Sequence, residues 1–439
     1  MRLPIALLAL CAMSACAPPA QVSKGGPATD TGIGFGDPSM RAVAAVSGGT
    51  SSLTRDFMDL TFALESGQDI TVFTRFEGPI TVALVGDVPA NASRDLAALV
   101  ARLQTEAGIG ITITTEDATI TVEFASRSEL RRLAPHAACF VVPNVGSLAD
   151  YRRLRGTPEV DWARITRRDR AAVFIPTDTS PQEVRDCLHE ELAQALGPLN
   201  DLYRLPESVF NDDNFHSVLT SFDMDILRLY YSPSLASGMT RSGVAARLST
   251  TVSGGASPTP SVWTDAIETA LGRTGSLAAR QAAADSALAI ATQAGWQDSR
   301  AAFSHFAVGR LWAGSAPEVS LMAFDRAAAI YARLPGGALQ VAHIDMQLAA
   351  MALASGQVIE AVQFADRAIP VVTRYENAAL LATLMLIKAE ALERMGDAQA
   401  AAALRLDSQV WARYGFGPDS VVKARIRDIA AVADRGSNG

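Results

Sequence analysis

The spacing of apolar residues changes once along this chain, at a stretch rich in Thr, Ser, Gly and Pro between residues 250 and 260. Before this stretch, from about Leu53 to Leu248, short alternating runs typical of strands are mixed with helical spacing. After it, alanine-rich segments keep helical spacing. We therefore expect two folded regions, at 51–249 and 261–435, joined by a linker at 250–260. A chain of 439 residues is long enough for two such cores.

The first region is expected to contain several strands and two well-marked helices. Residues 91–107 have helical spacing, with Ser93 as the expected N-cap. A second helix is expected to begin at Ser180, because Pro181 and Glu183 follow it as in a capping box. The expected strands lie within 69–84, 109–124, 139–142 and 171–175. This mixture predicts an α+β or α/β layered fold.

The second region repeats itself loosely. Gly314, Gly356 and Gly396 are 42 and 40 residues apart and are expected to lie in the turns of helix pairs. That period is typical of an all-α tetratricopeptide-like helical-repeat domain, although the full tetratricopeptide signature is absent. An irregular helical bundle is the alternative. Helical repeats offer surfaces suited to a protein or peptide partner.

The first sixteen residues have the form of a bacterial lipoprotein signal peptide. An apolar run at 5–13, too short to span a bilayer, follows the basic Arg2 and precedes Ser14, Ala15 and Cys16. We expect lipidation of Cys16, which would anchor the mature chain to a membrane; simple secretion is the alternative. Because residue 17 is not aspartate, we expect the outer membrane of a bacterial cell envelope, facing the periplasm.

Residues 17–50, rich in Gly, Ala, Ser, Pro and Thr, are expected to form a flexible tether. Of the four cysteines, Cys11 would leave with the signal peptide and Cys16 would carry lipid. Cys139 and Cys187 remain, and in an oxidising compartment we expect a disulfide between them.

The formal net charge of −8 argues against nucleic acid as a partner, because phosphate binding needs a basic face. A local run of basic residues is the exception. It is expected to be a solvated surface, with contact to an acidic glycan, lipopolysaccharide or a protein as the alternative. Its members are Arg152, Arg153, Arg155, Arg164, Arg167, Arg168 and Arg170.

Residues 187–201 combine a helical segment with carboxyl and amide side chains. Glu190 and Gln194 are one turn apart and lie about 40° apart around a helix, whereas His189 lies about 140° from Gln194. We therefore expect a structural or surface role for His189. A bend at Gly197 precedes Asn200 and Asp201.

This pattern resembles the metzincin zinc-peptidase motif, His-Glu-x-x-His-x-x-Gly-x-x-His/Asp. Glu190, Gln194 and Asn200 stand where the three zinc ligands belong, Glu191 stands at the general base and Gly197 at the bend. Zinc sites use imidazole or thiolate, with carboxylate as a minority ligand. We therefore expect an inactive peptidase-like domain that holds no metal or other cofactor.

The resemblance extends downstream. Residues 208–211 are similar to the Met-turn of metzincins, with Phe210 in place of methionine, and residues 219–230 are similar to the closing helix. The resemblance implies an α+β metzincin-like (zincin-like) layered domain.

The stretch from about Arg55 to Met239 is also similar to a family of bacterial secreted lipoproteins of unknown function. The phrases that carry this similarity are 56–62, 75–80, 190–197 and 210–212.

Three roles stay open for Glu190, Glu191, Gln194, Asn200 and Asp201: a structural polar network, a site for a hard cation or another ligand, and residual catalysis. A metallopeptidase with atypical ligands, or a cell-wall glycan hydrolase or binder using Glu191 with Asp201, remains an alternative. We predict a membrane-anchored binding or scaffold protein.

Overall fold

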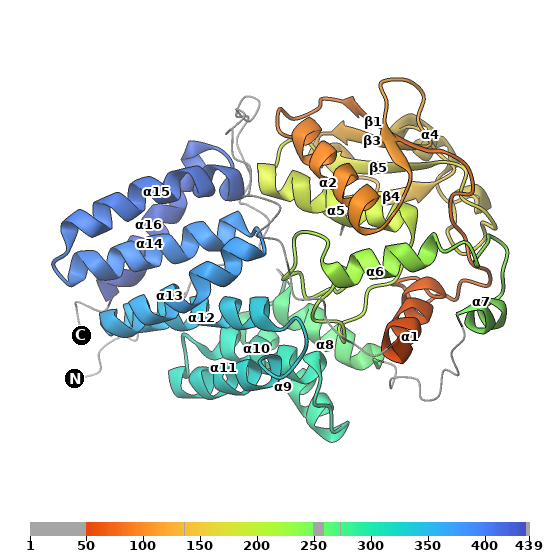
Figure 1. Cartoon of the computed structure of the whole chain (residues 1–439). Coiled ribbons are helices and arrows are strands. Elements are labelled where there is room, and N and C mark those ends of the chain that lie inside the picture. The colour runs from red at the N-terminus through yellow and green to blue at the C-terminus, as the bar shows by residue number, and fades with distance from the viewer. Residues whose placement is uncertain (1–49, 136, 249–258, 273, 436–439) are drawn as a thin grey trace.

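The computed structural model describes residues 50–135, 137–248, 259–272 and 274–435. A mixed α/β region is followed by an all-helical region, and the two lie side by side (Figure 1). This confirms the predicted order of fold classes. The expected signal peptide with Cys16, residues 17–49 of the expected tether at 17–50 and residues 250–258 of the expected linker at 250–260 lie outside the described residues. In the described part, no helix is both long and apolar enough to cross a bilayer.

The α/β region is built on one five-stranded sheet. Its spatial order is β2-β1-β3-β5-β4, in which only the edge strand β4 is antiparallel to its neighbour. Alternate residues of β5 enter separate cores, since Val173 packs in one cluster and Phe174 in another. The strands are β1 (Ile80–Gly86), β2 (Ile111–Ile113), β3 (Ile120–Ala125), β4 (Phe140–Pro143) and β5 (Ala171–Pro176).

Helices cover both faces of this sheet. One face packs against α2 (Ala92–Glu106) and α5 (Pro181–Leu196), and α1 (Thr50–Thr61) and α6 (Ser221–Tyr230) contribute to the same core. The other face carries α3 (Arg127–Leu130), α4 (Leu148–Leu154) and the short η2 (Pro158–Val160). A last helix, α7 (Arg241–Arg247), closes the region.

Two local predictions were wrong. Residues 69–76 form only isolated bridges, because their backbone groups bond to a distant segment: Phe73 N–H donates to the Met239 carbonyl at 2.8 Å. The first helix has its N-cap at Asn91 rather than Ser93, and Asn91 Nδ2 donates to Asp95 at 2.7 Å.

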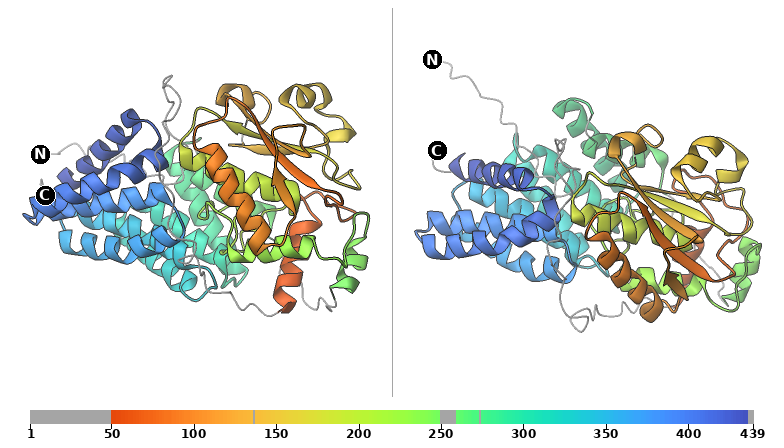
Figure 2. Two further views of the ribbon diagram at one scale, coloured as in Figure 1. Left: turned by 45° about the horizontal axis from the view of Figure 1, so that its top comes forward. Right: turned by 90° about the horizontal axis from the view of Figure 1, so that it is seen from above.

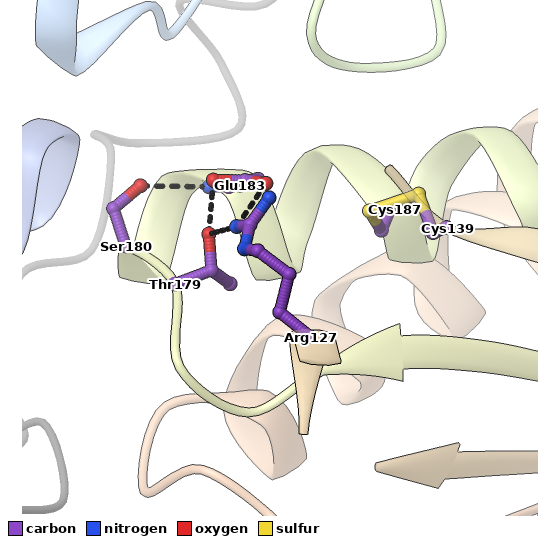
Figure 3. The surroundings of a disulfide bond; sticks show 6 residues. All are labelled: Arg127, Cys139, Thr179, Ser180, Glu183 and Cys187. Carbon is purple, nitrogen blue, oxygen red and sulfur yellow. Dashed lines mark hydrogen bonds and ion pairs between the residues drawn. A yellow bond between two sulfur atoms is a disulfide. The ribbon is translucent and has the colours of Figure 1, made fainter. Parts of the chain in front are cut away.

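The predicted disulfide joins Cys139, immediately before β4, to Cys187 on α5, with Cα atoms 6.0 Å apart (Figure 3). Both cysteines are buried. At the start of the same helix, Ser180 accepts a hydrogen bond from the Glu183 N–H, and Glu183 forms an ion pair with Arg127 at 2.7 Å. The helix is therefore fixed to the strand edge at one point. Ser180 caps its N-terminus as predicted, whereas the Glu183 side chain, expected to complete a capping box, binds Arg127 and Thr179.

The helical region is a series of antiparallel helices. Gly356 and Gly396 lie in the turns of successive pairs with φ of 75° and 89°, where glycine avoids the strain of other residues. The bounds are α8 (Ser261–Leu271), α9 (Leu277–Gln293), α10 (Ser299–Trp312), α11 (Pro317–Tyr331), α12 (Ala338–Ala354), α13 (Val358–Arg374), α14 (Ala378–Arg394), α15 (Ala398–Phe416) and α16 (Asp419–Arg435).

The core of the helical region includes residues from the α/β region. Tyr203 and Phe215, from the loop between α5 and α6, are 8% and 1% exposed and belong to the helical cluster. The ring of Tyr203 lies 5.0 Å from that of Trp263 on α8. The turned views in Figure 2 show the two regions side by side. They therefore share apolar core as well as polar contacts.

Candidate functional site

The residues singled out by the sequence lie on α5 and in the loop that follows it. The helix ends at Gly197, whose N–H donates to the Ala193 carbonyl at 2.8 Å. A Cβ at position 197 would lie 3.1 Å from the Tyr230 ring and 3.2 Å from the Leu227 side chain. Gly197 is favoured because another part of the chain approaches closely; its φ of −154° lies outside the left-handed region.

Arg168 satisfies the C-terminal carbonyls of α5. It is 3% exposed, and its guanidinium donates to the carbonyls of Gln194, Ala195 and Gly197. It also lies 4.8 Å from the Trp162 ring. A cation at a helix C-terminus complements both the free carbonyls and the helix dipole. The surface role expected for Arg168 is therefore wrong, and nothing in an arginine-rich run distinguishes this residue from its neighbours.

The carboxyl groups of Glu190, Glu191 and Asp201 are brought together at the end of α5. After burial, Glu190 is the next cause that raises the pKa of Glu191, and both Glu190 and Glu191 raise the pKa of Asp201. Glu65 and Asp212 join them; neither was predicted. Burial, with Asp212 and Glu65 next in importance, raises the pKa of Glu190 to about 7. Burial and Glu190 raise that of Glu191 well above its usual range.

A carboxyl group of the helical region also interacts electrostatically with this cluster of carboxyl side chains. Burial, followed by Glu65 and Glu268 of α8, raises the pKa of Asp212 to about 7. Glu268 also raises the pKa of Glu65. Carboxyl groups from both regions therefore face one another across the junction.

The carboxyl side chains of this cluster do not form a closed hydrogen-bonded network. Glu191 is 5% exposed, and within the described part of the chain its Oε2 has no hydrogen-bond partner; the same holds for Asp201 Oδ1. Asn200 turns elsewhere and donates to the Asp59 carbonyl at 2.9 Å. Gln194 contributes its main-chain carbonyl to Arg168. The arrangement favours protonated carboxyl groups, because buried like charges without a cation are costly.

The hydrogen bond and the burial of His189 agree with the structural role predicted for it. Its Nδ1 accepts a hydrogen bond from the Leu219 N–H at 3.1 Å, and the side chain is 5% exposed. Among the residues that the structure describes, no three His, Cys, Asp or Glu side chains are arranged to hold a metal ion.

Asp223 organises the turn that contains Phe210. Its carboxylate accepts hydrogen bonds from Ser208 Oγ at 2.6 Å and from the N–H groups of Val209 at 3.2 Å and Thr220 at 2.8 Å. Phe210 is fully buried beneath this turn. The capping box between Thr220 and Asp223 at the start of α6 was the sequence signal that could have identified Asp223.

The N-terminal half of α5 is held by the helical region. Gln182 accepts a hydrogen bond from the Ala379 N–H at 2.8 Å. Arg185, which is 4% exposed, donates to the Glu376 carbonyl at 2.6 Å and lies 5.4 Å from the Tyr414 ring. Thus α5 contacts both the sheet and the helical region, and it also carries part of the cluster of carboxyl side chains.

Comparison with known proteins shows that the α/β region is similar to a family without an established activity. Residues 50–250 match the model of a family described as a protein of unknown function, DUF2927. This supports the predicted similarity to a family of unknown function, and the match ends close to the expected boundary of the region. No curated protein and no solved structure matches the chain.

Proposed function

We propose that this protein is a lipid-anchored envelope protein that binds a partner, and that its α/β region is a metzincin-like domain without catalytic activity. The mixed sheet, with α5 following β5 and ending at Gly197, supports the metzincin-like assignment. The repeated helix pairs with glycine turns support a tetratricopeptide-like second region.

One observation carries the inactive assignment. The position corresponding to a metal site holds the acidic side chains of Glu190, Glu191 and Asp201, and His189 is committed to the Leu219 backbone. Zinc hydrolysis requires ligands that hold the ion and a base that is ionised near neutral pH. Here the ligand positions carry carboxyl and amide groups in place of imidazole, and burial and Glu190 raise the pKa of Glu191 well above its usual range.

The surroundings also oppose the binding of an extended substrate. Extended peptides commonly add to an open sheet edge. At the edge strand β4, the carbonyl of Val141 accepts a hydrogen bond from the Trp162 indole at 3.2 Å, and Arg168 packs on the same indole. This part of the edge is already occupied by the chain itself.

Metal analysis and a proteolysis assay on the full chain test the inactive assignment. We expect protein purified without chelator to contain no stoichiometric zinc, and we expect no chelator-sensitive proteolysis. One zinc per chain, together with proteolysis abolished by Glu191→Gln, would establish the metallopeptidase instead.

A cavity at the junction gives the partner-binding proposal a location. Its volume is about 440 Å³, and it lies between the loop before α6 and helices α11 to α13. Glu207, His216, Arg374 and Tyr375 supply polar groups, while Val341 and Leu334 are among the apolar ones. Such a volume is typical of sites that accept a side chain or a small ligand.

Crosslinking in the native host tests this location. We expect a partner captured by the wild-type chain to be lost with Arg374→Glu and kept with Arg333→Glu. Both arginines are exposed, but only Arg374 lines the cavity. Equal capture by both variants would contradict the proposal.

The anchor is tested separately. We expect the N-terminal peptide of the mature chain to begin with an acylated Cys16, and Cys16→Ser to release the protein from membranes. An unmodified Cys16 in protein from the native host would disprove the anchor.

A further inference from the structure

The arginine-rich run resolves into two different surfaces. On the face of the sheet opposite α5, α3 and α4 share a small apolar core that includes Leu130, Leu148 and Phe174. An ion pair between Arg152 of α4 and Glu129 of α3 joins the two helices. The segments 127–135 and 147–157 therefore form one continuous surface.

This surface, which we call the α3–α4 patch, is strongly basic. Its two segments contain six arginines and two carboxylates, and Arg127 is paired with Glu183 of α5, which leaves a net charge of +3 in a chain of −8. The two carboxylates, Glu129 and Asp150, are already paired, with Arg152 and Arg153. Both of those arginines stay accessible, with 47% and 66% of their side chains exposed.

Three further arginines of the patch carry the excess charge. Arg131, Arg132 and Arg155 are exposed, and within the described part of the chain their side chains form no hydrogen bond or ion pair. Arg131 and Arg132 lie outside the run that was apparent in the sequence. They join it only because α3 packs beside α4.

The other arginines of the run do not contribute to the patch. Arg164 pairs with Asp161 at 3.1 Å, and Arg170 pairs with Asp117 at 2.6 Å. Arg167 pairs with Asp169 at 2.8 Å. With Arg168 buried, this half of the run offers little charge to a partner.

We propose that the α3–α4 patch docks on the anionic phospholipid headgroups of a membrane surface. Guanidinium groups bind phosphate oxygens through paired hydrogen bonds, and clustered unpaired arginines suit a surface that carries many phosphates. Within the patch, α4 lies on the side of the α/β region away from the helical region (Figure 1).

This inference rests on the proposed anchor at Cys16. The 33 residues between Cys16 and α1 reach at most about 110 Å when fully extended, which allows the patch to meet the bilayer that holds the anchor. An anionic bilayer attracts the basic α3–α4 patch and repels the rest of this acidic chain. Charge complementarity therefore favours anionic headgroups as the partner of this patch.

Vesicle flotation with the full mature chain carrying Cys16→Ser tests the patch without the anchor. We expect binding to vesicles made of equal parts phosphatidylglycerol and phosphatidylcholine, no binding to phosphatidylcholine alone, and loss of binding at high salt. Each basic residue at an anionic surface strengthens binding roughly five-fold, so replacing Arg131, Arg132 and Arg155 by Gln should weaken it about 100-fold.

The matched control replaces Arg164, Arg167 and Arg170 by Gln, which removes the same charge from the paired half of the run. We expect this control to retain binding, with both variants showing wild-type circular dichroism. Equal weakening in both variants, or no binding by the unsubstituted chain, would overturn the proposal. Binding to lipopolysaccharide micelles without binding to the phospholipid vesicles would also overturn it. None of these results depends on whether Cys16 is acylated in the host.

Discussion

Arg168 Nη1 lies 2.8 Å from the carbonyl oxygen of Ala195, so an arginine from the segment before β5 terminates the helix that follows that strand. The same guanidinium reaches Thr74 through Nε at 3.2 Å. One buried cation therefore joins the end of α5 to the irregular segment at 69–76. Burial lowers the pKa of Arg168, and its acceptors are neutral carbonyls, so the contact depends on hydrogen-bond geometry more than on ion pairing.

Replacing Arg168 by methionine should destabilise the chain strongly. The change keeps an apolar stem but leaves three helix carbonyls without their donor, which costs about 3 kcal/mol or more. Urea unfolding measures the loss. Arg164→Met should change stability by at most about 0.5 kcal/mol, because Arg164 forms an exposed ion pair. Similar losses in both variants would contradict the capping role of Arg168.

Stability should fall as the pH rises from about 5 to about 8. Glu190 and Asp212 have folded pKa values of about 7, above their ordinary values of 4.5 and 3.8. A raised carboxyl pKa means that the folded state binds protons more tightly than the unfolded state. The resulting stability is complete below the ordinary pKa and is lost as the pH rises through 7. We expect a loss on the order of 2 kcal/mol, measured by denaturant unfolding.

Glu191→Gln should make this pH profile flatter, since it removes one buried ionisable group and relieves its repulsion of Asp201. Near neutral pH the variant should be at least as stable as the wild type. Glu360→Gln, an exposed change on α13, serves as the control and should keep the wild-type profile. If Glu191→Gln kept the wild-type pH profile, the Glu191 carboxyl group would not contribute to the pH dependence of stability.

Phe215→Ala should destabilise both regions together by about 3–5 kcal/mol, because the ring is buried among aromatic rings of α10, α11 and α12. We expect the sheet and the helical region to unfold in one transition. Circular dichroism and the fluorescence of the buried Trp263 both measure this transition. Leu406→Ala, at a site 65% exposed on α15, should have little effect. A change confined to one region would contradict the shared core.

Removal of the disulfide by Cys139→Ala with Cys187→Ala should cost about 4 kcal/mol, since the bond closes a loop with a sequence separation of 48. Thermal unfolding under oxidising conditions measures this loss. The wild type should approach the double variant when a reductant is added. A double variant as stable as the oxidised wild type would show that the strand edge and α5 are held without the covalent link.

The parts of the fold that could be predicted depend on local signals. The cap at Ser180, the bend at Gly197 and the pairing of Cys139 with Cys187 each follow from a few neighbouring residues or from elimination. The irregular path at 69–76 could not be predicted, because its backbone bonds to residues 237–240 replace those of a sheet.

The site was only half predictable for a similar reason. Glu190, Glu191 and Asp201 stand close in the sequence, so their meeting could be expected. Glu65 and Glu268 reach the same place through the packing of distant segments, and no local pattern marks them. The same holds for Arg131, which becomes part of a basic surface only through the contact between α3 and α4.

The placement of Tyr203 and Phe215 in the helical core sets an order of assembly. Ribosomes make the α/β region first, yet these two rings have no finished site until the chain has been synthesised as far as His343 on α12. The loop that carries them must stay unfinished while more than a hundred later residues emerge. The first region to be synthesised is thus among the last to be completed, and a truncated chain ending before α12 would leave two aromatic side chains open to aggregation.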